Sequence, residues 1–249
     1  MPELPEAERA RALVELRGLN RRIAAVEDSD TYVCRPHAPG EIHEALRGHH
    51  LISAMRRGKS MWFETDGGPT LYLHLGMAGR LLLDEEPHEP WDRFALQFED
   101  GGRLALRDKR RLGRAVLDPV LDRVGPDAAD ITPKAFRERI GRSRAPIKAR
   151  LMDQSAIAGL GNLLVDEILW RASLAPTRPA NELSDDELDG LRRHVRAALR
   201  DAMRGGGAHI GKFTPHRKKG GHCPRCKAEL ARGTVGGRTT FWCPVDQTE

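Results

Sequence analysis

The spacing of apolar residues changes along this chain of 249 residues, and each change predicts a different kind of structure. In the first segment, Ala7, Ala10, Leu13, Val14 and Leu16 approximate one apolar stripe at helical spacing. The glycine at position 18 is a typical helix stop. The pattern therefore predicts a helix over residues 5–18.

Residues 23–119 show a strand-like pattern instead. Short apolar runs, such as residues 61–63, 71–73 and 81–83, alternate with Gly, Asp and Pro. The pairs Asp66-Gly67 and Asp100-Gly101 stand where hairpin turns would fall. Turns at such regular intervals favour a β-sandwich or barrel.

Helix signals dominate after a linker at residues 118–133. Thr132 can cap a helix that has Pro133 at its first position. Further helices are expected at 147–152 and 162–171, and a long one from the capping box Ser184–Glu187 to about residue 203. We therefore expect an α+β chain with domains at 1–120 (β-sandwich with a flanking helix), 132–206 (helical) and 220–249 (a small cysteine-bearing hairpin).

The charge distribution indicates a polyanionic partner. The chain has 41 basic and 36 acidic residues and a formal net charge of +5, but residues 204–232 hold eight Lys or Arg and one acid. A second basic cluster lies at residues 107–114. Two separate basic patches are typical of a groove that follows phosphates. No apolar run reaches eighteen residues and no secretory leader is visible, so we expect a cytoplasmic protein without a membrane segment.

The cysteines near the C-terminus have the spacing of a zinc hairpin. Cys223 and Cys226 are separated by two residues, and Cys243 follows after sixteen more. The fourth position of such a site is Asp246, whose carboxylate can also bind zinc. His216 and His222 are alternative fourth ligands. A hairpin of this size cannot bury enough surface to fold alone, which favours a structural Zn2+.

The start of the chain carries candidate chemistry. Removal of Met1 would leave Pro2 with a secondary amine, and terminal amines titrate close enough to neutral pH to act as nucleophiles. Glu3 could move the protons that this chemistry requires. Taken alone, the segment could equally be an ordinary disordered terminus.

The order of the motifs decides between these interpretations. Residues 1–6 (Met-Pro-Glu-Leu-Pro-Glu) resemble the start of the formamidopyrimidine-DNA glycosylase and endonuclease VIII family of base-excision repair enzymes. The similarity continues in the family's order through nearly the whole chain, at residues 57–59, 74–79, 110–113, 159–162 and 238–243.

The resemblance implies an activity and a set of site residues. It implies a bifunctional DNA glycosylase and AP lyase that binds double-stranded DNA containing damaged bases or abasic sites. It implies a helix-two-turn-helix element in the helical domain. The catalytic residues would be Pro2, Glu3, Glu6 and Lys59, and the DNA-binding residues His74, Met77, Arg110, Leu112, Asn162 and Arg238. Met77, Arg110 and Leu112 would fill the gap that an extruded base leaves in the DNA double helix. Asn162, Arg238 and Lys59 would contact phosphates. Glycines 159 and 161 would leave backbone amides free at the helix start to bind a phosphate as well.

Three features depart from the family pattern, and the third of them limits the expected substrate. Asp246 replaces a cysteine, and Leu112 stands where the formamidopyrimidine branch has Phe. Only fifteen residues separate Gly207 from Cys223, so the loop that closes over oxidised guanine looks trimmed. We therefore expect weak excision of 8-oxoguanine. We also expect a monomer that is associated with the nucleoid through DNA. An abasic-site lyase and a non-catalytic DNA-binding protein of the same fold remain alternatives.

Overall fold

The computed structural model describes residues 2–84 and 87–248, which form two compact units. One unit contains Pro2 and Ala7–Leu121, and the other contains Glu3–Glu6 and the chain from Asp122 onward. Helix α1 (Leu4–Arg17) thus has its first turn in the second unit and the rest in the first. The helix predicted over residues 5–18 is confirmed to within one residue at each end.

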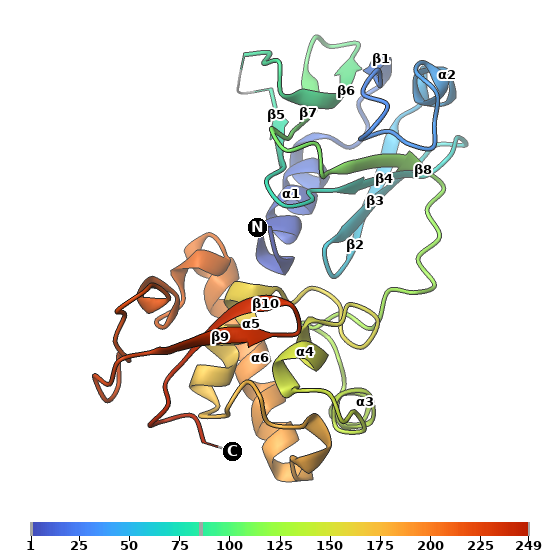
Figure 1. The fold of residues 1–249 in the computed structure, drawn as a ribbon. Helices are drawn as coiled ribbons and strands as arrows, with labels where there is room; N and C mark the ends of the chain where they lie inside the picture. The colour runs from blue at the N-terminus through green and yellow to red at the C-terminus, as the bar shows by residue number, and fades with distance from the viewer. Residues whose placement is uncertain (1, 85–86, 249) are drawn as a thin grey trace. The chain divides into compact units, whose positions relative to one another are not determined.

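The first unit contains two four-stranded antiparallel sheets (Figure 1). One sheet has the order β1 (Ile23–Glu27), β6 (Asp92–Phe98), β7 (Arg103–Arg107), β5 (Arg80–Leu83). The other has the order β2 (Leu51–Arg57), β3 (Ser60–Thr65), β4 (Leu71–His74), β8 (Arg114–Leu117). A short helix, α2 (Glu41–Leu46), adjoins β1 and was not predicted.

Alternating apolar side chains from both sheets form the core of this unit. Met61, Phe63, Leu71 and Leu73 come from one sheet and Phe94 from the other, and all are essentially fully buried in one cluster. Each such side chain contributes about 1.5–3 kcal/mol through burial. The predicted sandwich is therefore confirmed, and so are the predicted turns, where Gly67 and Gly101 have positive φ.

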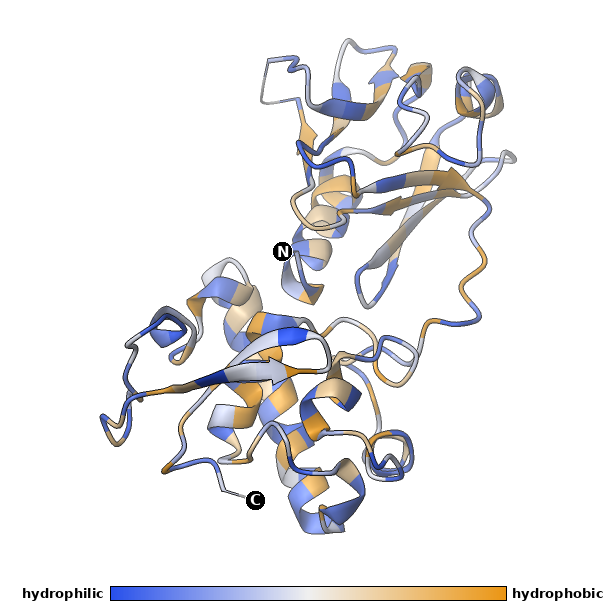
Figure 2. Cartoon of the chain, viewed as in Figure 1, coloured by the Kyte–Doolittle hydropathy of each residue, from blue (hydrophilic) through white to orange (hydrophobic). Residues whose placement is uncertain are grey.

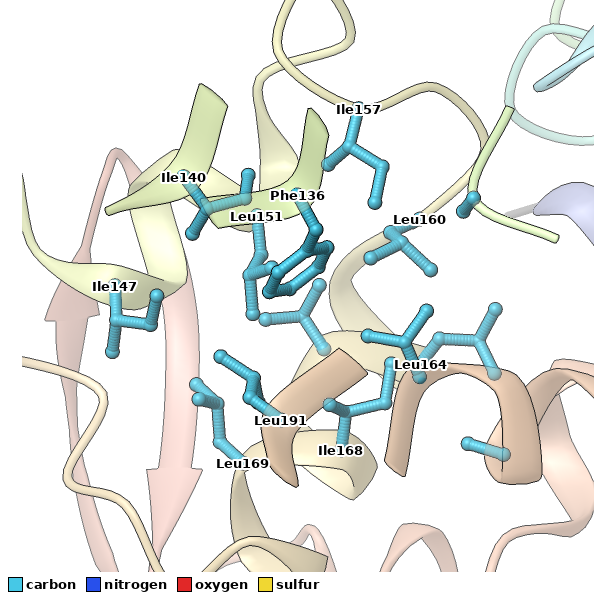
Figure 3. Packing of buried hydrophobic residues seen from close by; sticks show 14 of the residues in the cluster. Phe136, Ile140, Ile147, Leu151, Ile157, Leu160, Leu164, Ile168, Leu169 and Leu191 are labelled. Atoms are coloured by element: carbon cyan, nitrogen blue, oxygen red, sulfur yellow. The ribbon is translucent and has the colours of Figure 1, made fainter. Parts of the chain in front are cut away.

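The second unit is helical and has its own core (Figure 3). It contains α3 (Pro133–Ile140), α4 (Ile147–Met152), α5 (Asn162–Arg171) and α6 (Asp185–Gly205), with 3-10 turns at Ala180–Glu182, Ala208–Ile210 and Thr214–His216. Polar and apolar positions alternate along α6 at helical spacing (Figure 2), so that one face packs into the core. The Thr132 cap and the Ser184–Glu187 capping box are both present.

The C-terminal hairpin consists of β9 (Ala231–Val235) and β10 (Arg238–Trp242). Gly236 and Gly237 connect the strands, and both have the positive φ that a two-residue type I′ turn requires. A small cluster that includes Trp170, Phe213 and the buried Cys223 and Cys243 joins the cysteine region to α5. Among the described helices, none is both long and apolar enough to cross a bilayer.

Candidate active site and DNA-binding residues

The Glu3 carboxylate is fully buried at the N-terminus of α5. One oxygen accepts hydrogen bonds from the backbone N–H groups of Gly161 (2.9 Å) and Leu164 (3.2 Å), and the other accepts one from Leu163 (2.8 Å). The unpaired amides of a helix N-terminus and the helix dipole both stabilise a negative charge at this position. The carboxylate beside Pro2 is therefore fixed in position and stabilised as an anion.

This arrangement corrects the predicted role of the glycines before α5. We expected free amides there to bind a DNA phosphate, but those of Gly161, Leu163 and Leu164 bind Glu3 instead. A Cβ on Gly161 would lie 2.4 Å from the Glu3 Cδ atom. A glycine is required at this position because the carboxylate of Glu3 packs against it.

Glu6 connects the start of the chain to the segment after α6. One of its carboxylate oxygens accepts a hydrogen bond from the Glu3 N–H (2.9 Å), and the other accepts one from the Ala208 N–H (2.7 Å). Both oxygens are thus engaged by backbone donors. Glu6 therefore holds the peptide group between Pro2 and Glu3. Pro2 itself is half-buried.

Lys59 and His74 are neighbours on the first unit. Lys59 lies in the two-residue turn between β2 and β3. His74 ends β4, and its Nδ1 accepts a hydrogen bond from the Gly76 N–H (3.0 Å), which places the proton of the neutral ring on Nε2. Burial, then the charges of Lys59 and Arg114, lower the pKa of His74 to about 4. The ring is therefore neutral at pH 7.

The predicted helix-filling residues lie on two turns that pack together. Met77 follows Gly76 in the turn after β4, and Leu112 lies in the turn before β8. A Cβ on Gly76 would lie 2.4 Å from the Leu112 carbonyl group, so the backbones of the two turns are in close contact. Leu112 keeps 38% of its surface exposed, and Met77 is half-buried.

The two consecutive arginines of the second turn differ in their surroundings. Arg111 makes a bidentate ion pair with Asp30, with N–O distances of 2.8 and 3.0 Å. The Arg110 side chain is exposed and makes no ion pair with the described residues. Of the two, Arg110 is therefore the one available to a partner.

The predicted phosphate contacts of the second unit meet at β10. The Asn162 side chain donates a hydrogen bond to the Thr239 carbonyl (3.0 Å), next to the exposed Arg238. The Asn162 Oδ1 atom is buried and has no hydrogen-bond partner among the described residues. In this structure the Asn162 amide thus positions the arginine-bearing strand rather than facing solvent.

A buried ionic network beneath β10 was missed in the sequence. The Lys148 ammonium and the Asp166 carboxylate are both fully buried and lie 2.6 Å apart. Arg217 contacts the second oxygen of Asp166 (2.7 Å), and Lys148 also donates to the Thr239 carbonyl (3.4 Å). Burial lowers the pKa of Lys148, against the opposing effect of Asp166. The sequence signal for this network was Asp166, an acidic residue within the largely apolar sequence of α5.

The basic stretches are less exposed than their sequence suggests. Arg217 is nearly buried in its pair with Asp166, and Arg107 is buried in a pair with Asp92 (2.6 Å). Both arginines therefore stabilise the fold and are unavailable to a polyanion. The exposed charges that remain near Arg107 include Lys109 and Arg110.

The shortened segment between α6 and Cys223 is anchored at two places. Its start is held by Glu6 through the Ala208 N–H. Its middle is held by Glu167, which accepts hydrogen bonds from the N–H groups of Lys212 (3.1 Å) and Phe213 (2.7 Å). These contacts keep the segment against α5.

Three cysteines and one aspartate form a candidate metal centre. The ligand atoms of Cys223, Cys226, Cys243 and Asp246 all lie within 4.8 Å of one another. Thiolates around a tetrahedral zinc with Zn–S bonds near 2.3 Å are about 3.8 Å apart, so the cluster has the size of a closed site. The buried Trp170 donates its indole N–H to the Cys223 sulfur (3.4 Å), an outer-shell contact that orients the ligand. The residues present can hold a metal ion.

Comparison with known proteins agrees with this geometry. Residues 1–115 match the family model of the formamidopyrimidine-DNA glycosylase N-terminal domain, and residues 124–214 match that of its H2TH domain. Formamidopyrimidine-DNA glycosylases of Roseiflexus sp. and Lactococcus lactis are 37% and 34% identical to this chain, over 99% of it and 100% and 99% of their own lengths. The Roseiflexus alignment extends over 273 positions, so that relative contains residues that this chain lacks.

Solved structures give the same result. Lactococcus lactis Fpg in complex with DNA containing N7-benzyl-Fapy-dG has a TM-score of 0.88 and 31% identity, over 100% of both chains. The same enzyme in complex with abasic-site DNA has a TM-score of 0.88 and 30% identity, over 99% of this chain and 100% of that one. The chain therefore belongs to the formamidopyrimidine-DNA glycosylase family of base-excision-repair DNA glycosylases.

Proposed function

We propose that this protein is a bifunctional DNA glycosylase and AP lyase that uses Pro2 as its nucleophile. After removal of Met1, the Pro2 nitrogen would attack C1′ of the damaged nucleotide, and the base would leave with the electron pair of the glycosidic bond. The Pro2 nitrogen loses its proton, and protonation of O4′ lets the C1′–O4′ bond break, which opens the sugar and leaves an iminium between Pro2 and C1′. This iminium acidifies the C2′ proton. Loss of that proton and departure of the 3′ oxygen would cut the strand by elimination.

The observation that carries this proposal is the buried Glu3 carboxylate next to Pro2. Its three backbone hydrogen bonds fix the group that would transfer protons to and from the opening sugar. Glu6 would hold the Pro2–Glu3 peptide and stabilise the cationic intermediate. Lys59 would bind the phosphate near the lesion, beside His74.

Double-stranded DNA with damaged bases or abasic sites is the proposed partner of the monomeric protein. Met77 and Leu112, on their packed turns, would fill the space left by the extruded base together with Arg110. Asn162 and Arg238 would contact phosphates, and His74 would have a supporting role in DNA binding. Residues 1–120 would thus carry the chemistry, residues 132–206 would bind the backbone, and residues 220–249 would present Arg238.

Zinc is the metal we propose for the C-terminal cluster. Cys223, Cys226, Cys243 and Asp246 would hold it, and its role would be structural, since four protein donors leave no open position. A bound zinc would fix the hairpin and therefore the position of Arg238. An aspartate in place of a fourth thiolate should weaken metal retention.

The anchored segment after α6 supports a broad substrate range. Its amides at Ala208, Lys212 and Phe213 are used by Glu6 and Glu167. A site that lacks hydrogen bonds to one particular base discriminates poorly among bases. We therefore propose weak excision of 8-oxoguanine and clearer activity on abasic sites, ring-opened purines, hydantoins or oxidised pyrimidines.

A panel of otherwise identical duplexes tests this function. Each carries one of these lesions, and base release is separated from strand cleavage by analysing samples with and without alkali at one salt concentration. Excision of 8-oxoguanine opposite cytosine at rates equal to the other lesions would contradict the proposed range. Cleavage of abasic sites alone would establish the lyase alternative, and binding without any cleavage would establish the non-catalytic one.

A further inference from the structure

Asp108 is a fully buried acidic residue directly before the turn that contains Arg110 and Leu112. Its carboxylate accepts hydrogen bonds from the backbone N–H groups of Arg110 (2.9 Å), Leu112 (2.7 Å) and Gly113 (2.7 Å). One oxygen takes the first of these bonds and the other oxygen takes the second and third. Asp108 thus binds the backbone on both sides of Arg111.

The main chain of Asp108 is also held. Its N–H donates to the Trp91 carbonyl (2.9 Å), and its carbonyl accepts from the Arg93 guanidinium (3.2 Å). The main chain of Asp108 is therefore attached to β6 and to the residue before it, while the carboxylate of the same residue holds the turn. Movement of the turn would break several hydrogen bonds at once.

Two further contacts determine the shape of the turn. Arg111 has a left-handed backbone (φ 56°), which is costly for a residue with a side chain, and its guanidinium is paired with Asp30. On the other side, Gly76 packs against the Leu112 carbonyl. The turn is thus rigid, although Arg110 and Leu112 at its surface are exposed.

Rigidity matters for the role proposed for these side chains. A wedge that must insert into DNA when a base leaves pays less conformational entropy if its backbone is ordered beforehand. The three hydrogen bonds of the Asp108 carboxylate all come from backbone N–H groups, so they order the turn without covering Arg110 or Leu112.

We propose that Asp108 is a positioning residue for base extrusion, acting through the backbone of Arg110 and Leu112. This inference rests on the proposed function and extends it to a residue that makes no contact with DNA. It implies that Asp108 is needed when a paired base must be extruded and its partner stabilised. It is needed much less when no partner base is present.

The test is Asp108→Asn, which keeps the size of the side chain. An amide has one acceptor oxygen, so its NH2 group would face either the Arg110 N–H or those of Leu112 and Gly113. Excision of a hydantoin lesion is measured opposite cytosine and opposite a tetrahydrofuran residue. We expect a decrease of about tenfold or more opposite cytosine, corresponding to at least about 1.4 kcal/mol in the barrier, and less than about threefold opposite tetrahydrofuran.

The matched control is Asp28→Asn. Asp28 is also a buried carboxylate of this unit that accepts three backbone N–H groups, those of Gly40, Ile42 and His43, but its loop carries no proposed DNA-binding residue. Its substitution should destabilise the protein to a similar degree, measured by thermal unfolding. It should leave the ratio between the two duplexes unchanged.

A double-mutant cycle with Leu112→Ala provides the second measurement. If Asp108 acts through Leu112, the Asp108→Asn effect on the cytosine duplex should shrink in the Leu112→Ala background. Equal losses on both duplexes, or additive losses in the cycle, would overturn the inference while leaving the glycosylase proposal intact. Wild-type protein inactive on both duplexes would contradict the proposed function, and this inference with it.

Discussion

The carboxylate of Glu3 occupies the space that a side chain on Gly161 would need, because a Cβ there would lie 2.4 Å from the Glu3 Cδ atom. The two residues are 158 positions apart and are joined by a hydrogen bond of 2.9 Å. The start of the chain is thereby fixed to the N-terminus of α5. The position of the proposed nucleophile depends on this contact through the adjacent peptide.

Gly161→Ala should therefore impair both catalysis and stability. The added methyl group must displace Glu3, which we expect to cost about 1–3 kcal/mol of unfolding free energy. Displacement of a catalytic group by about 1 Å can reduce the rate about 100-fold. Thermal unfolding and cleavage of abasic-site DNA measure the two effects.

Gly190→Ala is the matched control for this substitution. Gly190 lies within α6, and the nearest atom to its Cβ position is the Arg193 guanidinium at 3.6 Å. Alanine there should stabilise the helix by about 0.5–1 kcal/mol without changing activity. Unchanged cleavage by Gly161→Ala would show that the Glu3 position is not critical.

His74 makes the stability of the protein depend on pH. Its pKa is about 4 in the folded protein, compared with an ordinary value of 6.5, so the unfolded chain binds a proton more readily. The contribution of His74 is fully present above pH 6.5 and is lost as the pH falls towards 4. At the lower limit the loss reaches about 3 kcal/mol.

Titration of the His74 ring by NMR measures this directly. We expect a neutral ring with its proton on Nε2 down to about pH 5, and a smaller acid-induced loss of stability in His74→Gln. A ring that titrates near pH 6.5 would contradict the buried environment derived for it.

The buried pair between Lys148 and Asp166 should be essential for the stability of the second unit. Asp166→Asn removes one charge and leaves the Lys148 ammonium buried, which we expect to cost about 3–5 kcal/mol. The triple variant Lys148→Met, Asp166→Leu and Arg217→Met, which also removes both cations that contact Asp166, should be less damaging than Asp166→Asn alone. Chemical denaturation of the wild type and the two variants gives the order, and a triple variant less stable than Asp166→Asn would contradict this explanation.

Asp246→Cys should strengthen metal retention. A fourth thiolate is a softer ligand for zinc than a carboxylate, so the variant should lose zinc to a chelator more slowly than the wild type, and Asp246→Ala should lose it faster. Glu229→Ala, on an exposed acid of the same hairpin that is outside the cluster, is the control. Faster loss after substitution of His216 or His222, with no effect of Asp246→Ala, would identify a different fourth ligand.

The sequence predicted the elements whose signals are local. The helices at 147–152 and 162–171 were predicted to the residue, and the capping box of α6 was visible in the sequence. Helix α2 was missed because it lies within residues 23–119, where the strand-like pattern dominates. The spacing of the three cysteines and Asp246 in the sequence was likewise enough to predict that they form one cluster.

The contacts of the site were harder to predict because they are not local. No pattern within residues 159–164 indicates that their amides bind a carboxylate from residue 3. Similarly, Arg107 and Arg217 cannot be distinguished from exposed basic residues in the sequence, because only the folded structure shows that their partners are buried carboxylates. Tertiary packing decides which charges face solvent.

The role of Pro2 as the nucleophile is tested most directly by borohydride trapping on duplex DNA with one abasic site. Protein with a confirmed Pro2 terminus should give a covalent adduct, since borohydride reduces the iminium to a stable amine. Pro2→Gly should give less adduct, and protein that retains Met1 should give none. No adduct with the confirmed Pro2 terminus, or an undiminished adduct with Met1 retained, would contradict the mechanism.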